Sequence, residues 1–237
     1  MTATPDVAAA LEDLRGRAVN YDEHGAPPAV TDGWHQDHRA VDLGREEPGE
    51  PVPDGVAERA HALVEGYEFT TPHLLRAIYR RGSDLVGRDL LLEGRFLRMR
   101  FLLGVRITES HDDLRAGPNG PERVVGWSYQ TLQGHLEQGR LTYEIVKEID
   151  TGRVTFRIDA YSRQAPIANP VLRLGFSVFG RANQLRFYRS ATRRLRALAT
   201  RPVPYRTVAR DGLVHAPSRA PRGRAEAWTL VFPHPGR

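Results

Sequence analysis

EIDTGRVTFRIDAYSR, residues 148–163, is the stretch of the chain that indicates its fold most clearly. Asp150-Thr151-Gly152 is a turn sequence, because aspartate and glycine favour the backbone angles of a tight hairpin. A strand with one face toward a core and the other toward water carries apolar side chains at alternate positions. After the turn, this pattern is met by Val154, Phe156, Ile158 and Ala160. We therefore predict that residues 153–163 form a strand of an antiparallel sheet.

Further strands are predicted on the N-terminal side of this hairpin, where β-branched and aromatic residues alternate with polar ones. Residues 112–121, DDLRAGPNGP, contain the glycines and prolines typical of a loop and are predicted to be one. Consecutive strands joined by turns form an antiparallel meander. The predicted strands are 89–97, 99–110, 123–132 and 140–149.

Helices are predicted on both sides of the strands. Asp54 is a suitable N-cap for a helix that ends at Gly66, and Thr71-Pro72 has the residue types that begin a second helix, with Arg81-Gly82 at its end. The longest predicted helix is Gly180 to Ala199, whose apolar stripe contains Leu185, Tyr188, Thr192, Leu195 and Leu198. The predicted fold class is therefore α+β, with two short N-terminal helices, a curved antiparallel sheet and a long C-terminal helix that covers the sheet.

Three parts of the chain are predicted from its composition. Residues 1–53 form an extended arm, because Pro, Gly, Asp and Glu recur there without apolar periodicity, apart from a short helix favoured at 8–17. Residues 54–199 form the single α+β domain. Residues 200–237 form a basic tail rich in Pro and Arg, in which 227–232 has the composition of a short strand.

The composition indicates a cytoplasmic bacterial protein. No cysteine is present, which excludes disulfides and thiolate chemistry, and residues 1–20 lack the apolar core of a secretion signal. No apolar run approaches the roughly 20 residues that a membrane span requires. The net charge is +5, and every one of the 34 basic residues except Lys147 is arginine, a bias typical of GC-rich genomes. We therefore attribute the positive charge to genome composition before we attribute it to a nucleic-acid partner.

GWSYQTLQGHLEQG, residues 126–139, resembles the signature of an uncharacterised family called domain of unknown function nineteen-ninety, which is found in plants and in many bacteria, especially actinobacteria. The resemblance covers most of residues 11–198, and its other segments are 20–22, 33–35, 90–107, 156–166 and 172–195. It implies similarity to the helix-grip superfamily of START and birch-pollen-allergen-like proteins. In such a fold a curved antiparallel sheet grips the C-terminal helix, and here the first strand would come from the N-terminal arm. The resemblance implies no established activity.

A pocket for an apolar or amphipathic ligand is expected between such a sheet and its helix. Trp127, Tyr129 and Thr131 alternate on one face of a predicted strand and are candidates to line this pocket. For the two aromatic residues, packing in a core is the stronger alternative.

A second strand offers candidates for holding a polar head group. Tyr161 and Arg163 share one face with Asp159, so all three can reach the same ligand. The alternative is an exposed charged face, which is the commoner use of such residues.

His135 and Glu137 lie two positions apart, and a histidine with a nearby carboxylate is a pair used in acid–base catalysis. With Tyr129 they are the candidate catalytic residues, and the alternative is a hydrogen bond that fixes the turn. No phosphate-binding glycine loop or nucleophile elbow occurs, so no cofactor is predicted. No metal is predicted either, because the pair shows no recognised ligand spacing with any of His24, His35, His38 or His111.

Three functions follow from these candidates. The leading hypothesis is the binding of a small apolar or amphipathic molecule between the sheet and the C-terminal helix. The second is an enzyme of the polyketide-cyclase or hydrolase type that uses the same pocket. The third is an interface for nucleic acid or an acidic partner on the arginine-rich segment 181–196, for which a solvated helix face is the simpler explanation. The sequence predicts no oligomeric state.

Overall fold

Ten strands make up one sheet in the computed structural model of this protein, which describes residues 6–22, 33–96, 99–166, 170–201, 209–218 and 228–231. The strand order is β1-β7-β6-β5-β4-β3-β2-β9-β8, and β10 pairs with β4. All neighbouring strands are antiparallel except β10 and β4, which are parallel. The strands are β1 His35–Arg45, β2 Leu75–Arg80, β3 Asp89–Phe96, β4 Met99–Gly117, β5 Gly120–Thr131, β6 Glu137–Glu148, β7 Arg153–Gln164, β8 Ala209–Arg210, β9 Leu213–Ala216 and β10 Trp228–Val231.

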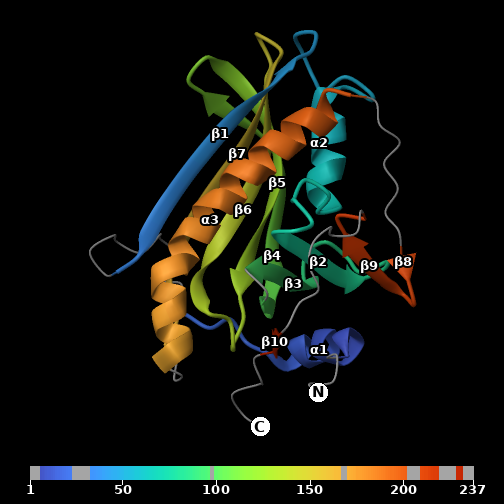
Figure 1. The fold of residues 1–237 in the computed structure, drawn as a ribbon. Helices are drawn as coiled ribbons and strands as arrows, with labels where there is room; N and C mark the ends of the chain where they lie inside the picture. The colour runs from blue at the N-terminus through green and yellow to red at the C-terminus, as the bar shows by residue number, and fades with distance from the viewer. Residues whose placement is uncertain are drawn as a thin grey trace.

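The long C-terminal helix α3, Pro170–Ala199, lies across one face of the sheet (Figure 1). Its predicted start at Gly180 is wrong, because the helix already begins at Pro170, where the missing N–H of proline costs no helical hydrogen bond. The helix turns a buried stripe toward the sheet, and this stripe consists of Tyr188, Ala191, Leu195 and Ala199. An antiparallel sheet closed on one side by a long C-terminal helix is the helix-grip fold, as predicted.

Two short helices precede the main run of strands. Helix α1, Val7–Asp13, continues into a short turn of 3₁₀ helix, and α2 covers Val56–Glu65. The N-cap of α2 is Gly55, so the prediction that Asp54 caps this helix is wrong by one position.

The second predicted helix, which was expected to begin at Thr71-Pro72, is wrong, because residues 75–80 form strand β2 between β3 and β9. Ala77, Ile78 and Tyr79 are all buried. Ile78 contacts a small core on one face of the sheet, whereas its two neighbours contact the main core on the other. A strand that is buried on both faces shows no polar–apolar alternation, so its sequence resembles that of a helix.

The loop predicted at 112–121 is also wrong, because β4 continues to Gly117 and β5 begins at Gly120. This part of the hairpin extends beyond the core and carries polar residues on both faces. Ion pairs hold it, among them Arg123 to Asp112 at 2.7 Å. Strand pairing there is maintained by the backbone rather than by apolar burial, so the sequence pattern does not show it.

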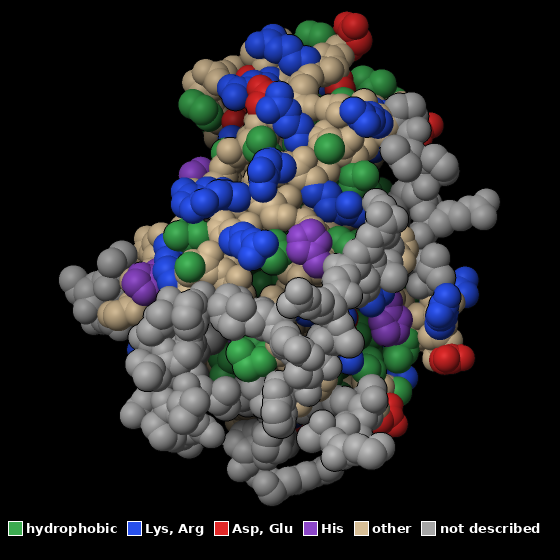
Figure 2. All heavy atoms as spheres, in the orientation of Figure 1, with side chains coloured by type: hydrophobic (Ala, Val, Ile, Leu, Met, Phe, Trp, Pro, Cys, Tyr) green, Lys and Arg blue, Asp and Glu red, His purple; other side chains and the backbone are tan. Residues whose placement is uncertain are grey.

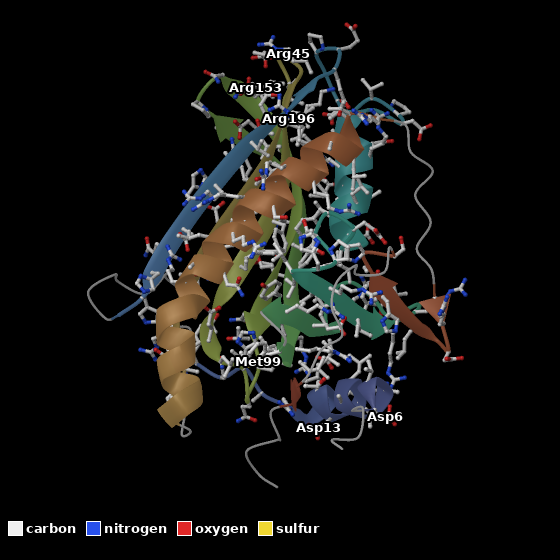
Figure 3. All side chains as sticks on the ribbon, viewed as in Figure 1. Asp6, Asp13, Arg45, Met99, Arg153 and Arg196 are labelled. Carbon is white, nitrogen blue, oxygen red and sulfur yellow. The ribbon has the colours of Figure 1, made fainter. Side chains whose placement is uncertain are left out.

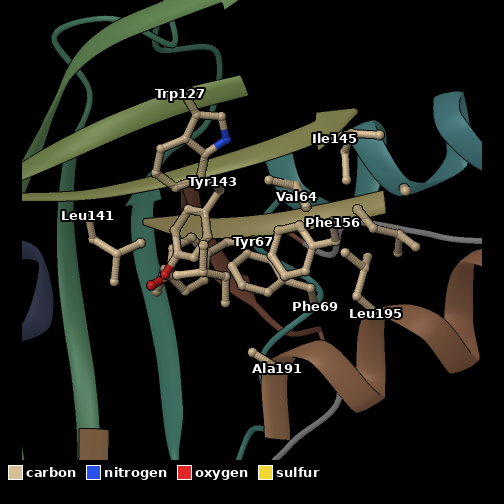
Figure 4. Close-up of a cluster of buried hydrophobic side chains, with 14 of the residues drawn as sticks. Val64, Tyr67, Phe69, Trp127, Leu141, Tyr143, Ile145, Phe156, Ala191 and Leu195 are labelled. Atoms are coloured by element: carbon tan, nitrogen blue, oxygen red, sulfur yellow. The ribbon is translucent and has the colours of Figure 1, made fainter. Parts of the chain in front are cut away.

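Two apolar cores lie on opposite faces of the sheet. The main core lies between the sheet and helices α2 and α3, and the smaller core lies under α1. Aromatic rings from the α2 turn and three strands fill the main core (Figure 4): Tyr67, Phe69, Trp127, Tyr143 and Phe156.

The sheet takes strands from each of the three predicted parts of the chain. Strand β1 comes from the predicted arm, as the family resemblance implied. Strand β10 confirms the short strand expected within 227–232, although Ala227 and Phe232 lie outside the described residues. The division into 1–53, 54–199 and 200–237 as folding units stays a prediction. In the part of the chain that the structure describes, no helix is long and apolar enough to cross a membrane.

Candidate functional site

A cavity of about 390 Å³ lies between the sheet and α3. Its walls come mainly from strands β3 to β7 on one side and from the middle of α3 on the other. Most of the lining is apolar, and it includes Leu75, Leu92, Phe101, Leu103, Leu141 and Phe187. Cavities of this size and character are typical sites for small ligands.

Small residues leave this end of the sheet unfilled. Gly94 on β3 and Ala160 on β7 line the cavity, and Gly180 lines it from α3. A Cβ atom added to Gly94 would meet only Leu75, at 3.8 Å, so the space beside it is open. At the other end of the sheet, large aromatic side chains fill the corresponding volume.

Three of the five predicted ligand-binding residues line the cavity, namely Tyr129, Thr131 and Tyr161. Trp127 does not, because it lies deeper in the aromatic core, with its ring 5.0 Å from that of Tyr143. The placement agrees with the alternative that Trp127 is part of the core. A ligand-binding role for the three lining residues stays a prediction.

Arg163, the fifth predicted residue, also lies outside the cavity lining. Its guanidinium group stacks on the ring of Trp34 at 4.6 Å and donates a hydrogen bond of 2.7 Å to Gln138. Asp159, on the same strand face, forms an exposed pair with His38 at 2.6 Å. These two side chains therefore bind to neighbouring protein groups at the surface.

The three candidate catalytic residues, Tyr129, His135 and Glu137, all line the cavity. The backbone N–H of Glu137 donates a hydrogen bond of 2.9 Å to Nδ1 of His135. Nδ1 also lies 3.0 Å from the carbonyl oxygen of Glu137, so the tautomer of the imidazole decides whether Nδ1 accepts from the N–H or donates to the carbonyl. Burial lowers the pKa of His135 to about 4, so this histidine is neutral at neutral pH. The hydrogen bond that fixes the turn is therefore present, and His135 also lines the cavity.

Glu137 has the carboxyl group best suited to proton transfer in this cavity. Burial raises its pKa to about 7, although the positive charge of Arg181 opposes the shift. Arg181 is itself paired with Asp37, which it contacts through Nη2 at 2.6 Å, so α3 is tied to β1 beside the cavity. A carboxyl group with a pKa near neutral exists in both forms at neutral pH, as an acid–base catalyst requires.

Tyrosine hydroxyls are a feature of the site that sequence reasoning missed. Tyr188 lines the cavity beside Tyr129, and the hydroxyls of Tyr67, Tyr143 and Tyr188 are buried without a hydrogen-bond partner among the described residues. Alternation with Leu141 predicts an inward position for Tyr143, but no sequence signal brings it together with Tyr67, which follows α2.

The structure does not bring the predicted histidines together with Glu137. His35 and His38 are exposed on β1, His111 lies 3.0 Å from Glu144, and His24 lies outside the described residues. Within the described ranges, no three His, Asp or Glu side chains are grouped closely enough to hold a metal ion.

The outer face of α3 is basic. Arg186, Arg189, Arg193 and Arg196 are exposed, whereas Arg194 is half-buried and donates to the carbonyl of Glu68 at 3.0 Å. Figure 2 shows basic side chains spread over this face of the molecule. In Figure 3, Arg45, Arg153 and Arg196 are labelled toward one end of the molecule and the cavity residue Met99 toward the other. The proposed nucleic-acid or acidic-partner interface stays a prediction.

Comparisons with known proteins found one family model and several similar structures. The family model described as domain of unknown function (DUF1990) matches residues 20–194. Among curated proteins, no sequence matches the chain. The chain is similar in structure to the Zhui aromatase/cyclase of Streptomyces sp. R1128, with 10% identity, a TM-score of 0.47 and coverage of 70% of this chain and 93% of that one.

A second similar structure is major latex-like protein 151 of Panax ginseng. The identity is 10% and the TM-score is 0.43, over 71% of this chain and 99% of the ginseng chain. At this identity a likeness concerns the fold alone, so the site must be interpreted from its own residues.

Proposed function

This chain belongs to the DUF1990 family, and from that premise we propose that it binds a small apolar or amphipathic molecule in the cavity between the sheet and α3. The observation that supports the proposal best is the lining, which is apolar on most sides and polar at a few positions. Such a lining favours a ligand with an apolar body and one or two polar groups.

The experiment compares the intact protein with a variant whose cavity is filled. Tetralin, a bicyclic hydrocarbon, is the probe, and binding is followed by calorimetric titration. Gly94→Leu places an apolar side chain in the open space beside Leu75. The matched control is Gly16→Leu, because a Cβ at Gly16 meets nothing within 4 Å and this residue lies outside the cavity lining.

The proposal predicts saturable binding of tetralin by the wild-type protein and by Gly16→Leu, and at least a tenfold weaker affinity for Gly94→Leu. Each tenfold corresponds to about 1.4 kcal/mol of binding free energy. No binding to the wild type, or equal binding by all three proteins, would contradict it.

A second candidate function is proton transfer to or from a ligand held in the same cavity. The observation that favours it is the position of Glu137, whose pKa near 7 and place in the lining suit a general base. In a ketone ligand, the carboxylate would take a proton from the carbon next to the carbonyl. The C–H electron pair would pass to the carbonyl oxygen. The carboxyl group would exchange its proton with solvent, and the enolate would then regain a proton from it, with its electron pair returning to carbon.

Exchange of hydrogen for deuterium in tetralone tests this second function. In deuterated water, catalysis predicts faster exchange at the carbon next to the carbonyl, with a rate that rises as pH passes through about 7. Glu137→Gln should abolish the acceleration. Glu47→Gln, a change at an exposed carboxylate after β1 and outside the cavity lining, should preserve it. Exchange at the uncatalysed rate with the wild-type protein would exclude this candidate.

A further inference from the structure

Three arginines surround one glutamate on the face of the sheet that carries the smaller core. In the register of the strands, Arg76 on β2 lies opposite Glu93 on β3, and Arg95 on β3 lies opposite Arg100 on β4. Glu93 and Arg95 are two positions apart, so all four side chains leave the same face of the sheet. Leu91, two positions before Glu93, belongs to the core under α1. The four charged residues form one group beside that core, which we call the arginine cluster.

The arginine cluster contains more positive charge than its one carboxylate balances. All three guanidinium groups contact Glu93, and three positive charges against one negative charge leave an excess of two. The arginine side chains are at most 14% exposed, so little water is present to screen their mutual repulsion. Glu68 is another carboxylate that acts on Arg76, but its effect is weaker than that of Glu93, and one of its oxygens accepts the N–H of Ser218.

Two of these arginines have hydrogen-bond donors without acceptors. Arg76 is 3.8 Å from Glu93, beyond hydrogen-bonding distance, and Nε of Arg100 contacts Glu93 without forming a hydrogen bond. Neither guanidinium group donates to any other residue that the structure describes. The Nε atoms are buried, whereas the Nη atoms retain exposed surface, so a molecule outside the sheet can reach them. Arg95, in contrast, is held by Glu93 at 2.9 Å and by the carbonyl of Pro72 at 3.2 Å.

His215 on β9 shows the effect of this charge on a neighbouring group. It lies opposite Ile78, two positions along β2 from Arg76 and on the same face. Burial is the main cause that lowers the pKa of His215, and the charges of Arg76 and Arg100 lower it further, against the opposing effect of Glu93. A negative charge brought to the cluster would therefore be favoured, and it would also act on His215.

We propose that the arginine cluster binds a phosphate group on the α1 face of the sheet, at a site separate from the cavity and independent of the function proposed for it. Guanidinium groups present pairs of N–H donors that match two oxygens of a phosphate. A phosphate dianion supplies the two negative charges that the cluster lacks, and its oxygens accept hydrogen bonds from the Nη atoms of Arg76 and Arg100. Inorganic phosphate and the phosphate of a monoester share this chemistry.

The test is a calorimetric titration of the full chain with inorganic phosphate at about pH 8, where a phosphate group is predominantly a dianion. An ionic strength of about 0.15 M, kept constant, screens the exposed arginines elsewhere on the surface. Arg76→Met and Arg100→Met each remove one guanidinium group that lacks a hydrogen bond. The matched control is Arg80→Met, from the same face of β2 as Arg76, where the guanidinium group is paired with Glu12. None of these three arginines lines the cavity.

We expect saturable binding to the wild type and to Arg80→Met, and an affinity at least about tenfold weaker for each of the two cluster variants, as for the loss of a charged hydrogen bond. Acetate, which has a single charge, should bind about tenfold more weakly than phosphate. No saturable binding to the wild type would overturn the proposal. Equal affinities in all four proteins would overturn it as well, because phosphate would then contact arginines outside the cluster.

Two further measurements guard against a variant that does not fold. Phosphate should raise the unfolding temperature of the wild type, since a ligand of the native state stabilises it. In the wild type, phosphate should also raise the pKa of His215, followed by NMR, because the bound anion offsets the charges of Arg76 and Arg100. Binding that leaves this pKa unchanged would contradict the proposed position. Phenyl phosphate separates the two sources: tighter binding than phosphate indicates an organic monoester, and weaker binding indicates the free ion.

Discussion

At the scale of single residues, Glu137 and His135 respond to the same cavity in opposite ways, because burial disfavours whichever form is charged. The pKa of Glu137 rises from 4.5 to about 7, so its neutral form is favoured. The pKa of His135 falls from 6.5 to about 4, again in favour of the neutral form. Both side chains are therefore neutral over part of the mildly acidic range.

A pH dependence of stability follows from these two pKa values. The contribution of Glu137 is fully present below pH 4.5 and is lost as pH rises through about 7. That of His135 is fully present above pH 6.5 and is lost as pH falls through about 4. The two contributions oppose each other, so the wild-type stability should change little between these values.

Single variants should reveal each contribution. The free energy of unfolding of Glu137→Gln, relative to wild type, should rise between about pH 5 and about pH 8. The free energy of unfolding of His135→Asn, relative to wild type, should rise as pH falls toward about pH 5. Asparagine is chosen because it retains an acceptor for the N–H of Glu137. Urea unfolding at several pH values measures both. Differences that do not vary with pH would contradict the assignment of these groups to a desolvated cavity.

Removal of an unpaired hydroxyl should not destabilise the protein. For Tyr143→Phe we expect the free energy of unfolding to stay equal to that of the wild type or to rise by up to about 2 kcal/mol. Tyr79→Phe breaks the 3.3 Å hydrogen bond to Gly66 and should lower the free energy of unfolding by about 1 kcal/mol. Thermal unfolding of the two variants compares them directly. A larger loss for Tyr143→Phe would show that its hydroxyl has a partner.

The sequence predicted part of the site at this scale. Alternation along β5 placed Tyr129 and Thr131 on one face, and both line the cavity. Along β7 it placed Tyr161 on the face opposite the apolar residues Phe156 and Ile158, yet Tyr161 lines the cavity as well. Alternation also placed Trp127 on the same face as Tyr129. It does not show at which position along the strand the packed core ends and the cavity begins. The contribution of Tyr67 depends on the turn after α2, which brings a distant segment against the strands. No local pattern reports such a contact.

At the scale of elements, one buried ion pair joins the loop after β1 to helix α2 and strand β6. Nζ of Lys147 lies 3.0 Å from a carboxylate oxygen of Glu46, and both side chains are almost completely buried. The same carboxylate accepts the N–H of Ala57 at 2.7 Å, which replaces the side-chain cap that Gly55 does not provide. Burial raises the pKa of Glu46, but these hydrogen bonds and Lys147 outweigh it, and the net shift is downward.

Lys147→Met should therefore cost about 3–5 kcal/mol of unfolding free energy, because it leaves the carboxylate of Glu46 buried without its counter-charge. The matched control is Arg153→Met, which removes a pair with Asp42 whose partners are 42% and 45% exposed, and it should cost less than about 1 kcal/mol. Adding Glu46→Gln to Lys147→Met should recover part of the loss. Denaturant unfolding of the three variants is the measurement, and equal costs for the two single changes would contradict the account.

Elements with one buried face were predictable from the sequence, and those without such a face were not. The strands β3, β5, β6 and β7 were predicted close to their observed bounds, as the period of two requires. Strand β2 is buried on both faces, and the outer part of β4 on neither, so both lack the pattern that identifies a strand. Helix α3 was found from the apolar stripe of its second part, whereas residues 170–179, PVLRLGFSVF, are apolar at positions all around a helix, so no single stripe identifies them.

At the scale of the whole molecule, the sheet and α3 enclose two different volumes. Near α2, aromatic side chains fill the space completely, whereas near Gly94 and Gly180 a cavity of about 390 Å³ remains. Tyr129 and Tyr188 lie where the two volumes meet, because both belong to the main core and also line the cavity. One sheet thus borders both a solid core and a cavity, and the order of large and small residues along the strands decides where each lies.

The most direct test of this account is an amide NMR titration of the full chain with tetralone. Binding in the cavity predicts concentration-dependent shifts for amides of Gly94, Leu103, Tyr129 and Gly139, which line it. Amides of Arg193 and Arg196, on the exposed face of α3, should keep their positions. Shifts confined to that outer face, or no shifts at all, would contradict the claim that the space between sheet and helix is a ligand site.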